Sequence, residues 1–204
     1  MLLLPRNVAK ISEVCNGDDH HRYSFSGVHV QEFKDSWRLE ATDGKKLIML
    51  QGEKTEPRKF HDKLAAESLE ALQGELFDFV MPADDWARAF KLLNKDADFV
   101  ALTGEERVIH IAADRHRFDS YALDKGFPRV ADIIPRKPAV FVLDVKALDL
   151  MAVLKAALAA NDPQMDDRVR LCFFDRNAPF GVQAFPPEGQ TFDALVMPLS
   201  IGNL

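Results

Sequence analysis

The sequence predicts an α+β fold built from three repeated β-α-β-β-β units, with the sheets outside and the helices on one face. Two observations carry this prediction. A helical pattern followed by three short alternating segments recurs along the chain, and two of the helices begin near residues 83 and 144, about 60 residues apart, as an internal duplication would place them. The 204 residues are 47% hydrophobic, which is typical of a globular protein with a core rather than of a disordered chain.

The first unit has a shortened leading strand. Its helix is expected from about Pro5 to Cys15, and its strands near 23–30, 37–41 and 45–50. Residues 53–74 begin polar and charged and continue with helix-forming residues. We expect them to form a connector insertion rather than a domain boundary.

The second unit shows the pattern most clearly. After an alternating strand over 76–80, Pro82 and two acidic residues favour the first turn of a helix, through the fixed φ of proline and the helix dipole. The helix is expected to extend to about Lys95. Strands are then expected at 98–103, 107–112 and 117–123, with turns at 104–105 and 114–115.

The third unit repeats the order of the second. A strand is expected over 139–143, with Asp144 as the N-cap of a helix that extends to about Asn161. Its strands are expected near 168–174, 180–185 and 192–197, with turns at 175–177 and 186–189.

Charge and cysteine content narrow the class of protein. Lys and Arg number 26 against 32 Asp and Glu, a formal net charge of −6, which argues weakly against coating nucleic acid by bulk charge but permits a local basic surface. Cys15 and Cys172 form no CxxC pair, so free buried thiols are expected rather than a disulfide scaffold or a zinc site.

The expected location is the cytoplasm. No apolar run approaches the roughly 18–20 residues of a membrane span. The opening MLLLP lacks the basic and long apolar regions of a signal peptide.

The apolar sides of the three expected helices predict which faces are buried. These sides hold Val8, Ile11, Val14 and Cys15 in the first helix, Trp86, Phe90 and Leu93 in the second, and Leu150, Met151, Leu154 and Leu158 in the third.

Cations gather on the opposite sides of two of these helices. The second helix carries Arg88, Lys91 and Lys95, and the first carries Arg6 and Lys10, diluted by Glu13. In one helix alone an ordinary solvated face would be the better explanation of such a cluster. Its recurrence favours a basic surface, although Lys146 and Lys155 lie toward separate flanks of the third helix.

Four segments resemble, in the same order, motifs of the bacterial DNA sliding clamp, the β subunit of DNA polymerase III. They are RYSFSGV at 22–28, LEATDGKKL at 39–47, FPRVADIIP at 127–135 and ALVMPL at 194–199. On the predicted frame they extend over nearly the whole chain except 53–74. The resemblance implies the DNA-clamp fold and a chain shorter than the family's three-domain protomer: a complete clamp-like domain at 1–137 joined directly to half a domain at 138–204.

As the resemblance implies, the protein would be a DNA replication or repair processivity factor without catalytic activity or cofactors. It would encircle duplex DNA as an oligomeric ring, through diffuse phosphate contacts that do not read sequence, with a clamp loader as a possible partner. By correspondence of helices, the DNA-binding residues would be Arg6, Lys10, Arg88, Lys91 and Lys95, with Lys146 and Lys155 as weaker additions.

The family also docks polymerases and repair proteins through short linear peptides in an apolar groove, a use that suits adaptable side chains such as Met. By correspondence of motifs, its wall would hold Phe25, Thr42, Gly44, Lys45, Lys46, Leu47, Pro128, Ile133, Leu195, Met197, Pro198, Leu199 and Ile201.

Some of these residues have alternative interpretations. Phe25, Leu47 and Leu195 would equally suit a core, and Gly44 an Asp-Gly turn. The sequence also departs from the family at Asp132 and after Leu199, which would change the peptides bound or mark a groove no longer used.

Enzyme classes find little support. The run of Asp and His residues at 18–21 lies in an expected loop, His110 alternates within a strand and His116 lies in a turn; no nucleophile arrangement or phosphate-binding loop accompanies them.

Three readings of the function therefore remain. The first is a minimal clamp, in which four copies of three units would complete a ring of twelve. The second is a clamp-derived peptide-binding module that does not encircle DNA, and the third is a remnant with structural roles only.

Overall fold

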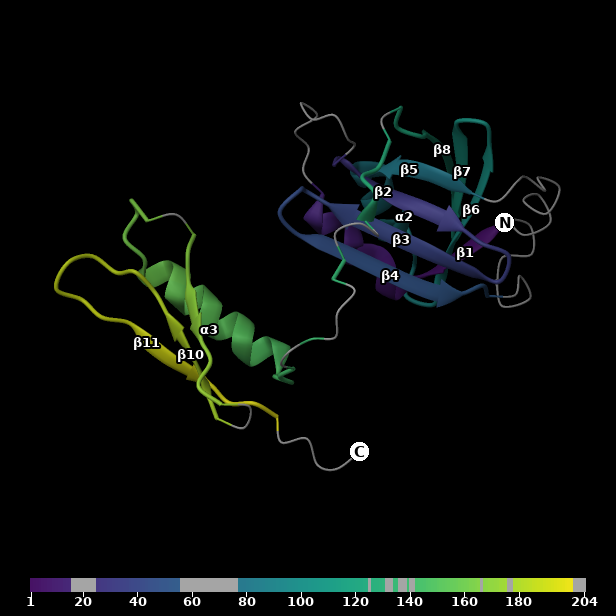
Figure 1. The fold of residues 1–204 in the computed structure, drawn as a ribbon. Helices are drawn as coiled ribbons and strands as arrows, with labels where there is room; N and C mark the ends of the chain where they lie inside the picture. Colours follow the sequence, from purple (N-terminus) through teal and green to yellow (C-terminus); the bar gives the residue numbers. More distant parts are fainter. Residues whose placement is uncertain are drawn as a thin grey trace. The chain divides into compact units, whose positions relative to one another are not determined.

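A computed structural model of the chain divides into two compact units, Met1–Ile133 (unit 1) and Ile134–Leu204 (unit 2), and each is described by itself (Figure 1). The structure describes residues 1–15, 25–55, 77–124, 126–130, 134–135, 139, 142–165, 167–175 and 178–199. The predicted connector lies outside the described residues from 56 onward. The mixed α+β fold with antiparallel sheets is as predicted.

Unit 1 contains two segments with the same order of elements. The first comprises β1 (Leu2–Pro5), η1 (Arg6–Val14), β2 (Gly27–Glu32), β3 (Ser36–Thr42) and β4 (Leu47–Glu53). The second comprises β5 (Asp78–Pro82), α2 (Ala83–Lys91), β6 (Phe99–Glu105), β7 (Val108–Ala113) and β8 (His116–Tyr121).

The two segments exchange their leading strands. The sheets have the orders β1-β6-β7-β8 and β4-β3-β2-β5. β1 lies antiparallel to β6, with Leu3 opposite Ala101, and β5 lies antiparallel to β2, with Met81 opposite Val28. Each leading strand therefore completes the sheet of the other segment, and neither segment has a four-stranded sheet by itself.

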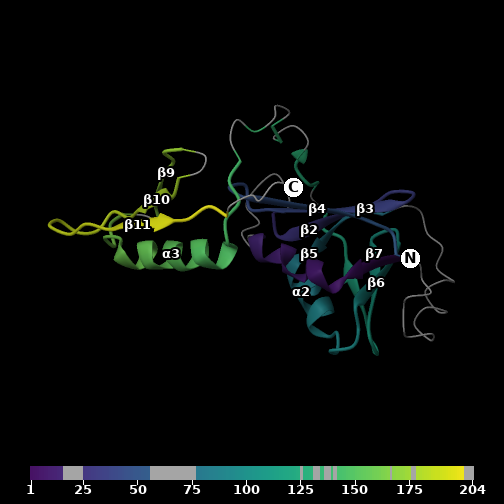
Figure 2. The ribbon, with the colours of Figure 1, turned by 90° about the horizontal axis from the view of Figure 1, so that it is seen from below.

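In the core of unit 1, the helices η1 and α2 pack against the sheets. Figure 2 shows both helices on one side of the sheet β4-β3-β2-β5. Trp86, 1% exposed, donates its indole N–H to the Ala9 carbonyl at 3.0 Å. Val8 and Phe90 belong to the same buried cluster, so the predicted apolar sides of both helices face the core.

The described residues of unit 2 form one helix and a three-stranded sheet. α3 (Ala147–Ala160) covers one face of the sheet β11-β10-β9, formed by β9 (Arg170–Cys172), β10 (Phe180–Gln183) and β11 (Asp193–Val196) (Figure 2). Its buried cluster consists of Ala157, Phe180, Val182, Ala184 and Val196.

The helices of unit 1 differ from the prediction. η1 is a 3₁₀ helix, and α2 ends at Lys91 rather than Lys95. The cause of the earlier end is Asn94, whose side-chain oxygen accepts the backbone N–H groups of Asp96 and Ala97 at 2.8 and 2.9 Å. Such a local bond competes with the helical pattern.

The turn predicted at 104–105 is also misplaced. β6 and β7 stay paired as far as Glu105 opposite Val108, so the turn falls on Glu106 and Arg107. Glu106 adopts the left-handed conformation there, with φ 54°, a conformation that non-glycine residues adopt infrequently. The predicted turn at 114–115 is observed.

Two predictions for the start of unit 2 are wrong. Ala139, Val142 and Leu143, the described residues of the expected strand 139–143, are not in a strand. The helix is preceded by Lys146 rather than Asp144 as its N-cap residue. A leading strand in this fold pairs with another segment, and the described residues of unit 2 offer none.

Met151 and Leu158 are exposed, contrary to the prediction that they face the core. α3 is apolar on more than one side, so its sequence pattern does not select a single buried face. The three-stranded sheet instead packs against Leu150, Val153 and Leu154 together with Ala157.

Candidate DNA-facing and peptide-binding surfaces

The turn between β3 and β4 is held by a local hydrogen-bond network. Asp43 Oδ1 accepts the backbone N–H groups of Lys45 and Lys46, each at 2.9 Å, and the Lys46 ammonium pairs with Oδ2. These bonds, that from the Lys46 side chain first, hold the pKa of the Asp43 carboxyl well below its usual range. Thr42 Oγ1 accepts the N–H of Gly44 and donates to the Lys46 carbonyl, at 3.0 and 2.7 Å.

Several predicted groove residues of unit 1 gather at this turn. Gly44 has φ +85°, as the turn interpretation predicts, and the Phe25 ring lies nearby, 3.5 Å from the position that a Cβ on Gly44 would take. Thr42 lies opposite Leu47 in the register of β3 and β4. Phe25 and Leu47 are half-buried and lie outside the buried core cluster, while Lys45 is exposed along with Lys46.

Cys15 lies close to the same turn. Its thiol donates to the Gly27 carbonyl at 3.4 Å. Burial first, and then the negative charge of Asp43, raise the pKa of the thiol to about 11. Cys15 and Cys172 are both free, as predicted, but only half-buried.

The groove residues of unit 2 lie on β11 and just after it. Leu195 and Met197 are 65% and 67% exposed, so Leu195 is not a core residue, and Leu199 is also exposed. Pro198 is half-buried. The structure thus groups these four residues along one stretch of unit 2.

The remaining groove residues are less informative. Pro128 is half-buried in unit 1, next to Phe127, whose ring stacks on His29 with centroids 4.8 Å apart. Ile133 and Ile201 lie outside the described residues.

Two of the predicted DNA-binding cations have partners within unit 1. Arg6 binds the Ala97 carbonyl through Nε at 3.2 Å and through a terminal nitrogen at 2.7 Å, and also contacts the Asn94 carbonyl. It therefore fastens the start of η1 to the chain that follows α2. Lys10 pairs with Glu13 at 2.9 Å on the exposed side of η1.

The other cations are exposed on or near helices. Arg88 stacks over the Phe118 ring, 4.4 Å from its centroid, and Lys91 is on the same exposed side of α2. Lys95 is exposed but lies beyond the end of α2. In unit 2, Lys146 and Lys155 are exposed at the start and in the middle of α3.

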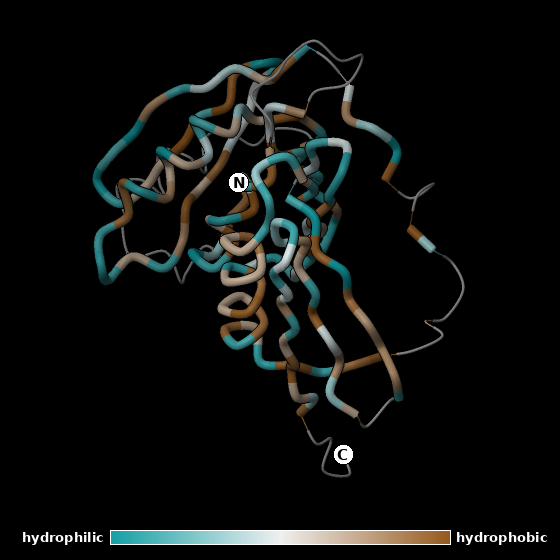
Figure 3. The backbone as a smooth tube through the Cα atoms, turned by 90° about the vertical axis from the view of Figure 1, so that its left-hand side faces the viewer, coloured by the Kyte–Doolittle hydropathy of each residue, from teal (hydrophilic) through white to brown (hydrophobic). Residues whose placement is uncertain are grey.

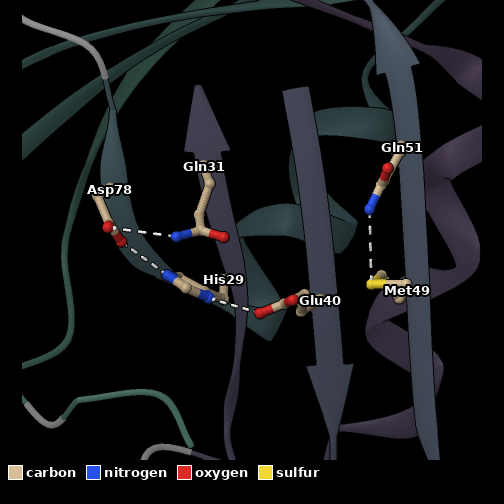
Figure 4. A network of polar contacts seen from close by, with 6 residues as sticks. All are labelled: His29, Gln31, Glu40, Met49, Gln51 and Asp78. Atoms are coloured by element: carbon tan, nitrogen blue, oxygen red, sulfur yellow. Dashed lines mark hydrogen bonds and ion pairs between the residues drawn. The ribbon is translucent and has the colours of Figure 1, made fainter. Parts of the chain in front are cut away.

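A histidine between two carboxylates is the polar feature that the sequence pattern missed (Figure 4). His29 on β2 contacts Glu40 of β3 through Nδ1 at 3.0 Å and Asp78 of β5 through Nε2 at 2.7 Å, and Gln31 also donates to Asp78. Only the strand order brings these residues together. Burial lowers the pKa of His29, but the hydrogen bonds and charges of Glu40 and Asp78 outweigh it, so the net pKa is raised.

The described residues contain no group of three or more His, Cys, Asp or Glu side chains able to hold a metal ion. The Asp and His run at 18–21 lies outside them. His110 pairs with Asp119 at 2.7 Å. In the part of the chain that the structure describes, no helix is long and apolar enough to cross a membrane.

Comparison with known proteins shows the fold. No protein-family model and no curated protein matches the sequence. Among solved structures, the DNA polymerase sliding clamp of Bacillus subtilis matches with a TM-score of 0.77 and 14% identity, over 97% of this chain and 48% of that chain. The sliding clamp of Pseudomonas aeruginosa matches with a TM-score of 0.74 and 16% identity, over 96% of this chain and 50% of that chain.

A Pseudomonas aeruginosa clamp bound to griselimycin also matches, with a TM-score of 0.73, 17% identity and coverage of 96% of this chain and 49% of that chain. The chain has the fold of bacterial DNA polymerase III β sliding clamps and spans about half the length of the clamps it matches.

Proposed function

We propose that the protein is a non-catalytic, cytoplasmic processivity factor for DNA replication or repair, which encircles duplex DNA as an oligomeric ring and docks partner peptides. The observation that carries the proposal is the clamp fold, which extends over 96% or more of the chain. Because the chain spans half a clamp, several copies would have to complete the ring.

The exposed side of η1 and α2 supports the DNA part of the proposal. Lys91 and Arg88 project from α2 away from the buried Trp86, and Lys95 follows the helix. Arg6 and Lys10 would contribute less, because both already have partners in unit 1. Exposed cations of this kind attract phosphates without reading bases, so binding should weaken with salt.

Encirclement is tested with circular and linear DNA. The protein should stay on a nicked plasmid during gel filtration and be lost after the plasmid is linearised, because a ring slides off an open end. Equal retention on both forms, with the protein in excess, contradicts encirclement.

The DNA surface is tested by charge reversal. The double variant Lys91→Glu and Lys95→Glu should weaken binding and reduce the slope of log affinity against log salt by about 0.9 for each phosphate that is no longer neutralised. Lys34→Glu, which changes an exposed charge in the turn between β2 and β3, is the matched control. An equal weakening in the control argues against a dedicated DNA surface.

The peptide part of the proposal rests on two surfaces, one in each unit. In unit 1, the β3–β4 turn beside Phe25 has a backbone fixed by hydrogen bonds and carries exposed lysines. In unit 2, the stretch from Leu195 to Leu199 carries exposed apolar side chains that include Met197. Apolar side chains of a linear peptide would bind such residues.

Peptide docking is tested by fluorescence anisotropy with a labelled linear peptide that ends in apolar residues. Leu47→Ala and Met197→Ala should each reduce affinity about tenfold, the effect of removing roughly 1.4 kcal/mol of apolar packing. Met49→Ala, which truncates an exposed methionine of β4 outside the predicted groove, should leave affinity unchanged.

A clamp-derived peptide-binding module is the second candidate. The exposed apolar side chains at Leu195, Met197 and Leu199 favour it, because such a surface could bind a peptide without a ring. It predicts peptide binding without preferential retention on circular DNA.

A further inference from the structure

Among the described residues, exposed large hydrophobic side chains are concentrated in unit 2. Among the described residues, fifteen large hydrophobic side chains are exposed, and twelve of them belong to unit 2, the shorter of the two units. Figure 3 shows α3 mostly in the hydrophobic shades. Concentrated exposed apolar surface marks an interaction site.

Part of this surface lies on the open edge of the sheet. Leu171 of β9 lies opposite the buried Val182 of β10 and so faces α3, yet it is 45% exposed, and the nearby Phe173 is 51% exposed. In unit 1 the first strand after each helix carries Val30 and Leu102 toward the core, at 0% and 1%. Those strands have a neighbour on both sides, whereas β9 pairs only with β10 in the described chain.

Another part lies on α3. Met151 and Leu158 are exposed on one flank of the helix and Leu148 beside them. In unit 1 a second helix occupies the flank of α2, where Trp86 contacts the Ala9 carbonyl of η1. Unit 2 has no second helix among its described residues.

The chain that leads into α3 is positioned as β5 is. The N–H of Leu199 donates to the Asp144 carbonyl at 2.7 Å, just as the N–H of Leu123 donates to the Val80 carbonyl at 2.9 Å. Each acceptor lies three residues before its helix. Val80 also pairs across to β2. The described residues of unit 2 contain no counterpart of β2, and Val142 is exposed.

Within its described residues, unit 2 therefore has a leading segment without a partner strand, and a first strand, β9, without a leading segment beside it. We propose that a second copy of this chain completes unit 2. The chain at Val142 and Leu143 of each copy pairs with the open edge of β9 of the other, and the two α3 helices pack together through Met151 and Leu158.

In a dimer with a two-fold axis, each copy contributes the same surface patch, so the open edges of both copies are paired at once. The result has the strand exchange observed within unit 1. The inference rests on one part of the proposed function, the assembly of several copies of the chain, and this association requires no DNA. Unit 1 of the same copy is a poor alternative, because both of its leading strands are already paired.

Sedimentation velocity of the full chain tests the proposal. We expect the chain to form a dimer or a multiple of it. The dissociation constant should rise roughly 100-fold or more in Leu171→Asp and in Met151→Asp, because each substitution would bury an unpaired charge in the interface. The control is Phe174→Asp. Phe174 is 73% exposed on the other face of the sheet, next to Gly181, so this variant should still dimerise, and circular dichroism checks that all three variants fold.

Cross-linking distinguishes a second copy from coverage within one copy. With the two native cysteines replaced by alanine, Val142→Cys and Leu171→Cys are made in separate chains, mixed and treated with a short bis-maleimide. Linked pairs of chains are expected. A monomeric mass at all concentrations, or a cross-link formed only within a chain carrying both cysteines, would overturn the proposal. A dimer that fails to hold circular DNA would instead overturn the proposed function alone.

Discussion

His29 illustrates how the fold controls the charge of one side chain. It lies between Glu40 and Asp78, which come from the two strands on either side of β2. The raised pKa of His29 means that the charged form binds these carboxylates more strongly in the folded state than in the unfolded chain.

The sign of this shift gives a pH-dependent stability. The contribution of His29 is complete below its unfolded pKa of about 6.5 and is lost as the pH rises through the raised value. His29→Gln should therefore lower the free energy of unfolding by about 1–2 kcal/mol near pH 6, and by less as the pH increases toward 9. Urea unfolding across this range measures the difference.

The assignment of the cause can be checked separately. In Asp78→Asn, an NMR titration should find the pKa of His29 lower than in the natural chain, because one of the two opposing charges is gone. An unchanged pKa of His29 would mean that Asp78 does not stabilise the protonated imidazole.

At the scale of elements, the contact between η1 and α2 holds unit 1 together. Trp86 is fully buried and reaches across to the Ala9 carbonyl. Trp86→Ala should reduce the free energy of unfolding by about 3–5 kcal/mol, because apolar packing is removed and a cavity is left behind. Lys91→Ala on the exposed side of α2 should change it by less than about 0.5 kcal/mol. Equal effects of the two substitutions in urea unfolding would contradict the packing described.

Sequence patterns predicted the order of elements in unit 1 well, because its helices have one clearly apolar side and its strands are separated by recognisable turns. They failed where a single side chain or a distant strand decides the outcome. Asn94 ends α2 before Lys95, and nothing local to residues 139–143 reveals whether a partner strand is available to them.

The residues of the candidate sites also differ in how far the sequence alone predicts their position. Gly44 is recognisable from the Asp-Gly turn pattern alone. The exposure of Leu195 could not be predicted, since an apolar residue in a short strand suits either face until the sheet's covering is known. The cluster around His29 depends on β2, β3 and β5 lying side by side, which periodicity does not reveal.

At the scale of the whole molecule, the two units should report differently during unfolding. Both tryptophans, Trp37 and Trp86, belong to unit 1, so their fluorescence follows that unit alone, whereas far-ultraviolet circular dichroism follows both. If unit 2 is completed by a second copy, its melting temperature should rise with protein concentration.

We therefore expect a concentration-dependent transition by circular dichroism that tryptophan fluorescence does not show. A single transition that coincides for both probes at all concentrations would indicate that the units unfold together and that association does not stabilise unit 2.

The exchange of leading strands in unit 1 also sets an order of events during synthesis. Leu3 pairs with Ala101, nearly a hundred residues later in the chain, so β1 has no partner strand until the second segment has left the ribosome. Contacts this distant in sequence are slow to form, and unpaired strand edges are prone to aggregation. The nascent chain therefore carries an exposed, apolar β1 through most of the translation of unit 1, a period in which a chaperone would protect it.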